Sequence, residues 1–446
     1  VALQGLIDDA PIGTFQFRII ALCFAIVAID GFDTAAAAFI APAIRAEWAL
    51  TPAALAPMFG AGLFGLMIGA LTIGPFADRL GRRPLLIFSV LFFGLASLGA
   101  AWSSTLGELT FWRFVTGLGL GAAMPSAITL TSEYCPDRRR SFLVTLMFCG
   151  FTLGSALGGL LAAELVADHG WRSVLLAGGL APVVLAVLLL AWLPESARFL
   201  VMRDPASPKA AALMARIAPG RVPAGARFSG PVKPKGLPVA QLFSRSLVAG
   251  TLLLWLSFFM SLLVYYLLTN WLPTFINAGG ATLREAALIT MLLQIGGTLG
   301  GVALGLIMDR TSPHLTLATA YLGGGVCVAL IGNSSGIPGL LPLAVFGAGF
   351  CIAGSQIGIN ALAAQFYPTA NRATGVSWAN GIGRSGSVVG SMVGGLLLSF
   401  NWGFETIFAI AAVPAVIAGL AIFLKRRIAR RGGDVAPVLA TAAPEA

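Results

Sequence analysis

The sequence predicts an all-α integral membrane protein with twelve transmembrane helices in two pseudo-symmetric six-helix bundles. Three observations support this fold class. The chain of 446 residues is 57% hydrophobic and only 10% charged, whereas soluble domains carry about 25% charged residues. Twelve apolar runs are long enough to cross a bilayer, six on either side of a segment rich in Pro, Gly and basic residues. Short motifs also recur at matching positions in the two halves.

The first six apolar runs define an N-terminal bundle, residues 1–193. They cover about residues 17–43, 53–77, 84–103, 107–132, 141–165 and 171–193. Residues 194–245 contain no spanning run and are expected to form a cytoplasmic linker. The C-terminal bundle, residues 246–424, has runs at about 246–271, 284–308, 315–333, 338–364, 373–400 and 404–424. Residues 425–446 are expected to form a cytoplasmic tail that is basic at first and then disordered.

Positive charge collects on one side of these predicted helices. If both termini face the cytoplasm, 23 of the 28 Lys and Arg residues fall in cytoplasmic segments. The positive-inside rule therefore predicts a multi-pass protein of the cell inner membrane with both termini in the cytoplasm. The net charge of +10 is then explained by topology and by contacts with anionic lipid, so no nucleic acid partner is expected.

An internal repeat relates the two halves. The string Gly74-Pro-Phe-Ala-Asp78-Arg79 ends the second predicted helix, and Gly305-Leu-Ile-Met-Asp309-Arg310 ends the eighth, 231 residues later. Ile40-Ala-Pro42 and Trp271-Leu-Pro273 are separated by the same offset. Matching motifs at matching helix ends indicate two bundles of common design.

Cysteine and histidine usage indicates neither a metal site nor a cofactor. The five Cys residues lie in or beside apolar runs without metal-ligand spacing, and only two His residues occur. No nucleophile–base set or cofactor-binding loop is found, so an enzyme is not expected. The N-terminal region lacks the charged segment and cleavage site of a signal peptide, so the first apolar run is expected to be retained.

Two carboxylates, Asp30 and Asp33, lie near the middle of the first predicted helix. A charge at that depth costs about 2.5–3.5 kcal/mol on insertion scales, so an intramembrane carboxylate indicates a functional site. The spacing of three residues places both side chains on nearly one helix face. We expect them to take part in proton coupling; the alternative is a satisfied pair that only joins helices.

Arg113 in the fourth predicted helix is the expected partner of one of these carboxylates. It lies about two turns from the outer surface, against about three turns for Asp33 and four for Asp30. Depth therefore favours Asp33 for the pair and leaves Asp30 as the titrating group. Because an ion pair favours the charged form of a carboxylate, breaking the pair would act as a proton switch. A static buried ion pair is the alternative interpretation.

Arg384, near the middle of the eleventh predicted helix, has no acidic residue at matching depth in the C-terminal half. A guanidinium group binds a carboxylate in bidentate geometry, so Arg384 is the candidate ligand for an anionic substrate, with Arg113 as a second candidate. The polar and aromatic residues expected near it are Tyr265, Tyr266, Asn270, Gln294, Gln356, Asn360, Trp378 and Asn380. Each of these could equally be a helix-packing contact.

Charged residues at the cytoplasmic helix ends are expected to control opening and closing. Asp78 can face a helix N-terminus of the opposite half, while neighbouring Arg side chains tie adjacent helix ends. The candidate gating residues are Asp78, Arg79, Arg82, Arg83, Glu133, Arg139, Asp309 and Arg310. Glycine ladders in the fifth and eleventh helices are interpreted as packing surfaces.

The string Gly74-Pro-Phe-Ala-Asp78-Arg79-Leu-Gly81-Arg82-Arg83 resembles the signature loop of the major facilitator superfamily. Asp30-Gly-Phe-Asp33, Arg113-Phe-x-Thr-Gly-Leu-Gly-Leu-Gly and Ser132-Glu133-Tyr-x-Pro136 are similar to motifs of its aromatic acid:proton symporters, the carriers of 4-hydroxybenzoate, gentisate and protocatechuate. The resemblance covers about residues 3–425. It implies the major facilitator fold and uptake of an aromatic carboxylate with a proton by alternating access, with the first-helix Asp-Gly-x-Asp needed for transport.

Two further strings qualify this resemblance. The loop of the second half keeps Asp309-Arg310 but lacks the following Gly-Arg-Arg, which weakens any latch there. Pro194-Glu195-Ser196-x-Arg198 is shared with sugar and organic cation carriers and discriminates little between substrates.

Two alternatives remain open at this point. One is a proton-coupled carrier of aliphatic organic acids or sugars, and the other is a membrane sensor that binds acids without transporting them. The internal repeat and the lack of a soluble signalling domain favour transport. The expected partners are a small aromatic carboxylate, protons and membrane lipid, and a monomer is expected.

Overall fold

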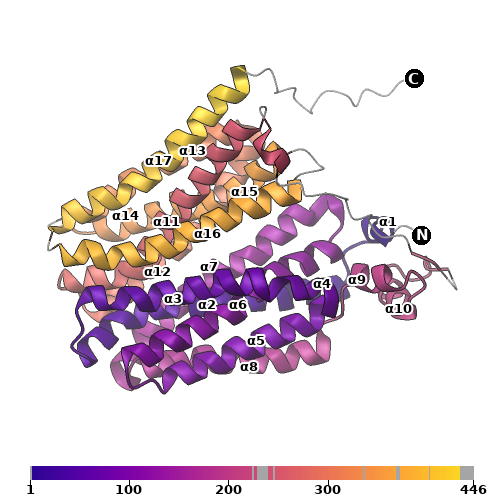
Figure 1. Ribbon diagram of the computed structural model, residues 1–446, viewed down its shortest axis with the longest axis horizontal. Helices are drawn as coiled ribbons and strands as arrows, with labels where there is room; N and C mark the ends of the chain where they lie inside the picture. Colours follow the sequence, from indigo (N-terminus) through magenta and orange to yellow (C-terminus); the bar gives the residue numbers. More distant parts are fainter. Residues whose placement is uncertain are drawn as a thin grey trace.

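The computed structural model describes residues 3–223, 226–228, 240–244, 247–334, 337–367, 372–400 and 402–431. Within these ranges the regular structure is helical and contains no strand. Two bundles of long helices lie side by side, one from each half of the chain (Figure 1). The predicted all-α fold with two bundles is confirmed.

The N-terminal bundle contains six long helices and is preceded by the short helix α1 (Leu3–Asp8). In chain order the long helices are α2 (Thr14–Glu47), α3 (Ala56–Thr72), α5 (Arg82–Ala101), α6 (Leu106–Tyr134), α7 (Asp137–His169) and α8 (Arg172–Trp192). The shorter η1 (Pro52–Leu55), η2 (Gly74–Phe76) and α4 (Ala77–Leu80) flank α3. Several long helices extend past the predicted runs, because hydropathy marks the membrane-embedded part of a helix and not its polar ends.

The C-terminal bundle repeats this plan. Its helices are α11 (Val248–Ala278), α12 (Leu283–Arg310), α13 (Pro313–Gly332), α14 (Leu340–Ala348), α15 (Gly354–Phe366), α16 (Arg372–Ser399) and α17 (Phe404–Arg431). A π-helical turn, η4 (Gly349–Ala353), joins α14 to α15, so these three form one continuous span.

Eleven helical segments in the described ranges are long and apolar enough to cross a membrane. The remaining long helix, α16, stands where the eleventh run was predicted but is not among the eleven. Its Gly, Ser and Asn residues, together with Arg384, reduce its apolar character. α16 packs along α11 and α3, where small and polar residues are accommodated between helices. With α16, the described part of the chain has a long helical segment at each of the twelve predicted spans.

The segment between the bundles contains helices that the sequence analysis did not predict. These are α9 (Ala197–Arg203), α10 (Pro208–Ile217) and η3 (Ala240–Phe243). Met214 and Ile217 of α10 are buried against the N-terminal bundle. We call the end of the molecule that carries α1, α9 and α10 the linker end, and the opposite end the distal end.

The predicted tail is partly helical. α17 continues to Arg431, so the basic residues 425–431 belong to the last helix and not to a tail. Residues 432–446, predicted to be disordered, lie outside the described ranges.

Glycine permits close contact in two equivalent helix pairs, α2 with α7 and α11 with α16. A Cβ atom at Gly154 of α7 would collide with the backbone oxygen of Ala28, and one at Gly390 of α16 with the backbone oxygen of Leu263. The predicted role of both glycine ladders in packing is therefore confirmed. The pairing of first with fifth and seventh with eleventh helix also supports the internal repeat.

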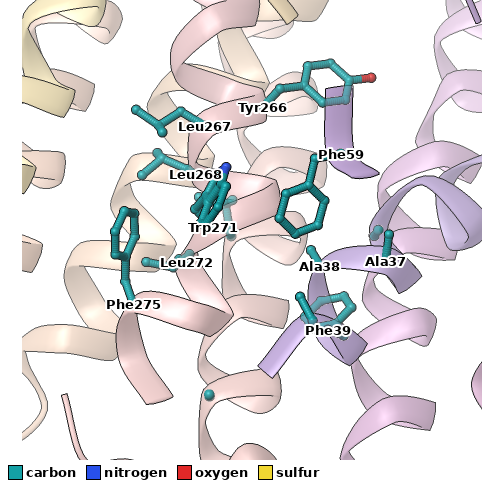
Figure 2. Close-up of a cluster of buried hydrophobic side chains, with 14 of the residues drawn as sticks. Ala37, Ala38, Phe39, Phe59, Tyr266, Leu267, Leu268, Trp271, Leu272 and Phe275 are labelled. Atoms are coloured by element: carbon teal, nitrogen blue, oxygen red, sulfur yellow. The ribbon is translucent and has the colours of Figure 1, made fainter. Parts of the chain in front are cut away.

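Within the described ranges, the apolar core joins the bundles at the distal end. There Phe59 of α3 meets Trp271 of α11 with ring centroids 5.1 Å apart, and Trp271 donates from Nε1 to the backbone oxygen of Ser391. Figure 2 shows Phe39 and Phe59 of one bundle against Trp271 and Phe275 of the other. Towards the linker end the core divides into two separate clusters, one in each bundle. Among the described residues, the bundles therefore share an apolar core at the distal end and have separate cores towards the linker end.

Candidate functional site

Asp33 and Arg113 form an ion pair in the middle of the N-terminal bundle. Nη1 of Arg113 lies 3.0 Å from Oδ2 of Asp33, and Nη2 donates to the backbone oxygen of Asp33 over 3.1 Å. Ser97 of α5 donates to Oδ1 of Asp33 over 3.1 Å. Both charged side chains are buried, Asp33 completely. The structure thus pairs the two residues that sequence depth had matched.

Asp30 lies about one turn earlier on α2 and is bonded much less completely. Its Oδ1 accepts from Thr34 over 3.3 Å, while its Oδ2 is buried without a hydrogen-bond partner in the described part of the chain. Asp30 interacts electrostatically with Arg384 of α16 and with Tyr266 of α11. The two carboxylates therefore have different roles in packing: Asp33 is held inside one bundle, and Asp30 faces the other.

Arg384 is a cation at the boundary between the bundles. Its Nη1 donates to the hydroxyl of Tyr266 over 3.5 Å, and its Nη2 lies 3.6 Å from Sδ of Met124 on α6. It is partly buried, and among the described residues no carboxylate forms an ion pair with it. Tyr266 is 3% exposed, and its hydroxyl points away from the Trp271 cluster (Figure 2). Asp30, Tyr266 and Arg384 thus form one polar group between the bundles.

Most of the predicted polar ligands in the C-terminal bundle are hydrogen-bonded to one another. Tyr265 donates to Gln294 over 3.0 Å, and both side chains are buried. Gln356 accepts from Ser261 over 2.6 Å, and Asn380 donates to Asn360 over 2.9 Å. The first pair ties α11 to α12. Gln356, Asn360 and Asn380 are only partly buried, and so they can also bind a ligand.

Trp378 and Asn270 occupy different surroundings from this group. Trp378 is 44% exposed and stacks on Trp255 with ring centroids 6.0 Å apart. We therefore leave it out of the site. Asn270 lines a small cavity of about 20 Å³ with Thr34 and Arg113. Nε of Arg113 is also buried with no hydrogen-bond partner among the described residues. The rest of the cavity lining is apolar or glycine. A cavity of this size has room for about one water molecule, and it lies between Arg113 and α11 of the other bundle.

The predicted gating residues at the linker end contact neighbours inside the N-terminal bundle. Arg82 donates from Nη1 to the backbone oxygen of Ala77 over 2.9 Å, and Arg83 from Nη2 to that of Leu190 over 2.6 Å. Oε1 of Glu195 accepts from the backbone N–H groups of Arg82 and Arg83, over 2.8 and 3.1 Å. These contacts attach the start of α5 to the end of α8, as expected for Arg side chains that tie adjacent helix ends.

The remaining gating candidates differ in their surroundings. Glu133 is buried and accepts a hydrogen bond from Ser196, the N-cap residue of α9. Arg79, Arg139 and Arg310 are exposed. The side chains of Asp78 and Asp309 lie outside the description, and with them the predicted contact of Asp78 with the opposite half.

The sequence profile of the Major Facilitator Superfamily matches residues 23–332 and 280–437. The chain belongs to the major facilitator superfamily. It is accordingly a multi-pass transporter-type protein of the inner membrane. Its fold resembles that of the xylose transporter XylE from E. coli, solved in a partially occluded inward open conformation. The TM-score is 0.73 at 18% identity, over 92% of this chain and 98% of that one.

Curated relatives place the chain among the aromatic acid members of the superfamily. The 4-hydroxybenzoate transporter PcaK of Pseudomonas aeruginosa is 48% identical over 427 residues, which cover 95% of each chain. A gallate transporter of Pseudomonas putida is 49% identical over 424 residues, covering 95% of this chain and 94% of the relative. The resemblance inferred from the motifs is confirmed, and these relatives are named as transporters and not as enzymes.

Sequence reasoning missed three residues that shape this major facilitator site. Glu195 belongs to a motif shared by several kinds of carrier, and the motif does not reveal that its carboxylate accepts hydrogen bonds from the backbone at the start of α5. Thr34, one turn after Asp30, could have been found from the i, i+4 spacing. Ser97 had no signal in the sequence, since its contact with Asp33 depends on how α5 sits in the bundle.

Proposed function

We propose that this protein takes up an aromatic carboxylate of the hydroxybenzoate type together with protons, by alternating access. The observation that carries the proposal is the position of Arg384, a partly buried cation between the bundles without a carboxylate partner among the described residues. A guanidinium at this depth without an ion-pair partner is costly in a membrane protein, and a substrate carboxylate can supply that partner. The 4-hydroxybenzoate and gallate transporters among the relatives support this substrate class.

The substrate carboxylate binds to Arg384, with the hydroxyl of Tyr266 beside it. The partly buried amides of Gln356, Asn360 and Asn380 supply donors and acceptors for the ring hydroxyl groups. 4-Hydroxybenzoate and gallate share a carboxylate and a hydroxyl opposite it on the ring. An anion contact at one end and an amide contact at the other distinguish such acids from sugars, which lack the charge, and from unsubstituted benzoate.

Proton coupling follows from the charges around Asp30. Arg384 acts on both Asp30 and the incoming substrate carboxylate, so the two anions compete for one guanidinium group. A proton on Asp30 removes that competition, and the proton and the acid then enter together. Asp33 is the positioning partner in this scheme, since Arg113 and Ser97 keep it in a fixed place. The small cavity lined by Arg113 and Asn270 lies between the Asp33–Arg113 pair and the C-terminal bundle, which moves during transport.

The linker end faces the cytoplasm in this proposal. The exposed basic residues Arg79, Arg139 and Arg310 lie at that end, which agrees with the positive-inside rule. The bundles share an apolar core at the distal end and have separate cores towards the linker end, which supports opening of the site towards the cytoplasm. Transport requires the opposite arrangement, with the Phe59–Trp271 contact opened. The protein is proposed to act as a monomer.

The test is uptake of radiolabelled 4-hydroxybenzoate into proteoliposomes with an imposed pH gradient. We expect accumulation when the outside is acidic, and its collapse when a protonophore is added. Unlabelled gallate should compete, while xylose and an aliphatic dicarboxylate should not. Accumulation that does not depend on the pH gradient would contradict proton coupling. Binding without counterflow would indicate a sensor and not a transporter.

A further inference from the structure

A groove runs along the outer face of the N-terminal bundle at the linker end, between the linker helices α9 and α10 and the membrane helices α5 and α8. Its volume is about 870 Å³. None of its lining residues belongs to the C-terminal bundle or to the Arg384 site. Helix α10 in Figure 1 stands beside the ends of α5 and α8 and away from the bundle boundary.

One part of the groove is apolar and continues onto the surface of the membrane helices. Phe88 of α5 and Leu190 of α8 line it and are 54% and 56% exposed. Leu213 of α10 covers the same groove from the linker side. Because α5 and α8 are membrane spans, exposed apolar side chains on them meet lipid chains and not water.

The other part of the groove is basic. Arg83, Lys209 and Arg216 line it, from α5 and α10. In the described part of the chain none of the three forms an ion pair with a carboxylate. Arg83 donates to the backbone oxygen of Leu190, and Arg216 lies 5.3 Å above the ring of Phe15. Lys209 is exposed.

Glu195 is the one acidic residue in the lining, and it is hydrogen-bonded to the backbone. Its Oε1 accepts from the backbone N–H groups of Arg82, Arg83 and Ser196, over 2.8, 3.1 and 2.8 Å. These backbone donors hold the carboxylate in place, and one carboxylate faces three cations in the lining. The groove therefore keeps an excess of positive charge next to an apolar strip at the membrane surface.

We propose that this groove binds an anionic phospholipid, such as phosphatidylglycerol. The headgroup phosphate lies among Arg83, Lys209 and Arg216, and an acyl chain runs over Phe88 and Leu190. Basic pockets at the ends of membrane helices bind anionic headgroups in this way. A free phosphate would use only the basic part and leave the apolar strip uncovered. The bound lipid attaches α10 to α5 and α8, and so stabilises the linker on the bundle.

The experiment is native mass spectrometry of the delipidated full-length protein in detergent, titrated with phosphatidylglycerol or phosphatidylcholine. We expect at least one retained phosphatidylglycerol and a matching rise in the thermal unfolding temperature. The double variant Lys209→Gln/Arg216→Gln should bind this lipid roughly tenfold to thirtyfold more weakly, from the loss of two basic contacts. The control Arg138→Gln/Arg203→Gln removes the same charge from exposed positions outside the groove and should bind as the native protein does.

Three results would overturn the proposal. Equal retention of phosphatidylcholine would show that the headgroup charge is not recognised. Unchanged phosphatidylglycerol binding by the Lys209→Gln/Arg216→Gln variant would show that the lipid does not bind in this groove. An equal rise in unfolding temperature with soluble glycerol phosphate would identify a phosphate site without a lipid chain.

Discussion

Arg113 of α6 holds Asp33 of α2 by two contacts, from Nη1 to the carboxylate over 3.0 Å and from Nη2 to the backbone oxygen over 3.1 Å. The second contact fixes the helix backbone as well as the side chain. Asp30, on the same helix, forms no ion pair of this kind among the described residues, and it interacts electrostatically with Arg384 of the other bundle. The two carboxylates of one motif are therefore divided between a pair inside one bundle and the boundary between the bundles.

Removing one member of the Asp33–Arg113 pair should destabilise the protein strongly. Asp33→Ala leaves a buried guanidinium without its carboxylate, and loss of one partner of a buried pair typically costs about 3–5 kcal/mol. We expect the double variant Asp33→Leu/Arg113→Met to recover most of that loss, because no uncompensated charge remains. Unfolding in detergent measures both. Equal losses in the single and double variants would show that the pair's charges do not interact.

Asp30→Asn should abolish accumulation driven by a pH gradient and leave counterflow exchange of labelled 4-hydroxybenzoate. The amide resembles a permanently protonated carboxyl group, so it keeps the acid-binding state and cannot release a proton. Asp30→Glu, which keeps the titratable group, is the matched control. The unfolding temperature of Asp30→Asn should change little, since Asp30 forms no ion pair in the described part of the chain. Gradient-driven accumulation by Asp30→Asn would exclude it as the titrating group.

Arg384→Lys should weaken binding of 4-hydroxybenzoate by about tenfold, because Lys keeps the charge but cannot form two parallel hydrogen bonds to a carboxylate. Arg384→Gln should weaken it further, by about a hundredfold. Calorimetric titration of the purified protein measures both affinities. Arg203→Gln removes a positive charge from an exposed position at the linker end and should bind normally. An unchanged affinity in Arg384→Gln would place the carboxylate elsewhere.

Gly154→Ala should lower the free energy of unfolding by about 1–3 kcal/mol, because an added methyl group collides with the backbone oxygen of Ala28 on α2. Gly305→Ala is the control, since a Cβ atom there meets nothing within 4 Å. A helix interior gains up to about 1 kcal/mol when Ala replaces Gly, so this control should be neutral or stabilising. Equal destabilisation by both changes would contradict the close packing of α2 and α7.

Much of the fold could be predicted because its causes act along the chain. Spans were found from apolar runs, although α16 is a helix that apolar character alone identifies poorly. Helices α9 and α10 were missed, since short surface helices between spans have no comparable hydropathy signal. In the site, counting helical turns from the outer membrane surface matched Arg113 with Asp33 correctly, because the rise per residue of a helix is constant. The same counting could not separate Trp378, which lies against Trp255, from residues facing Arg384.

By itself the sequence determined a membrane protein of twelve helices in two related halves, with two carboxylates and two arginines placed at costly depths. The bilayer explains this, since it penalises every charge and every unpaired backbone group according to its depth along a helix. Only the tertiary structure decided that Asp33 is enclosed within one bundle while Asp30 faces Arg384 and Tyr266 of the other. That division depends on the rotation of α2 against α6 and α16, which is set by side-chain packing between helices far apart in the chain.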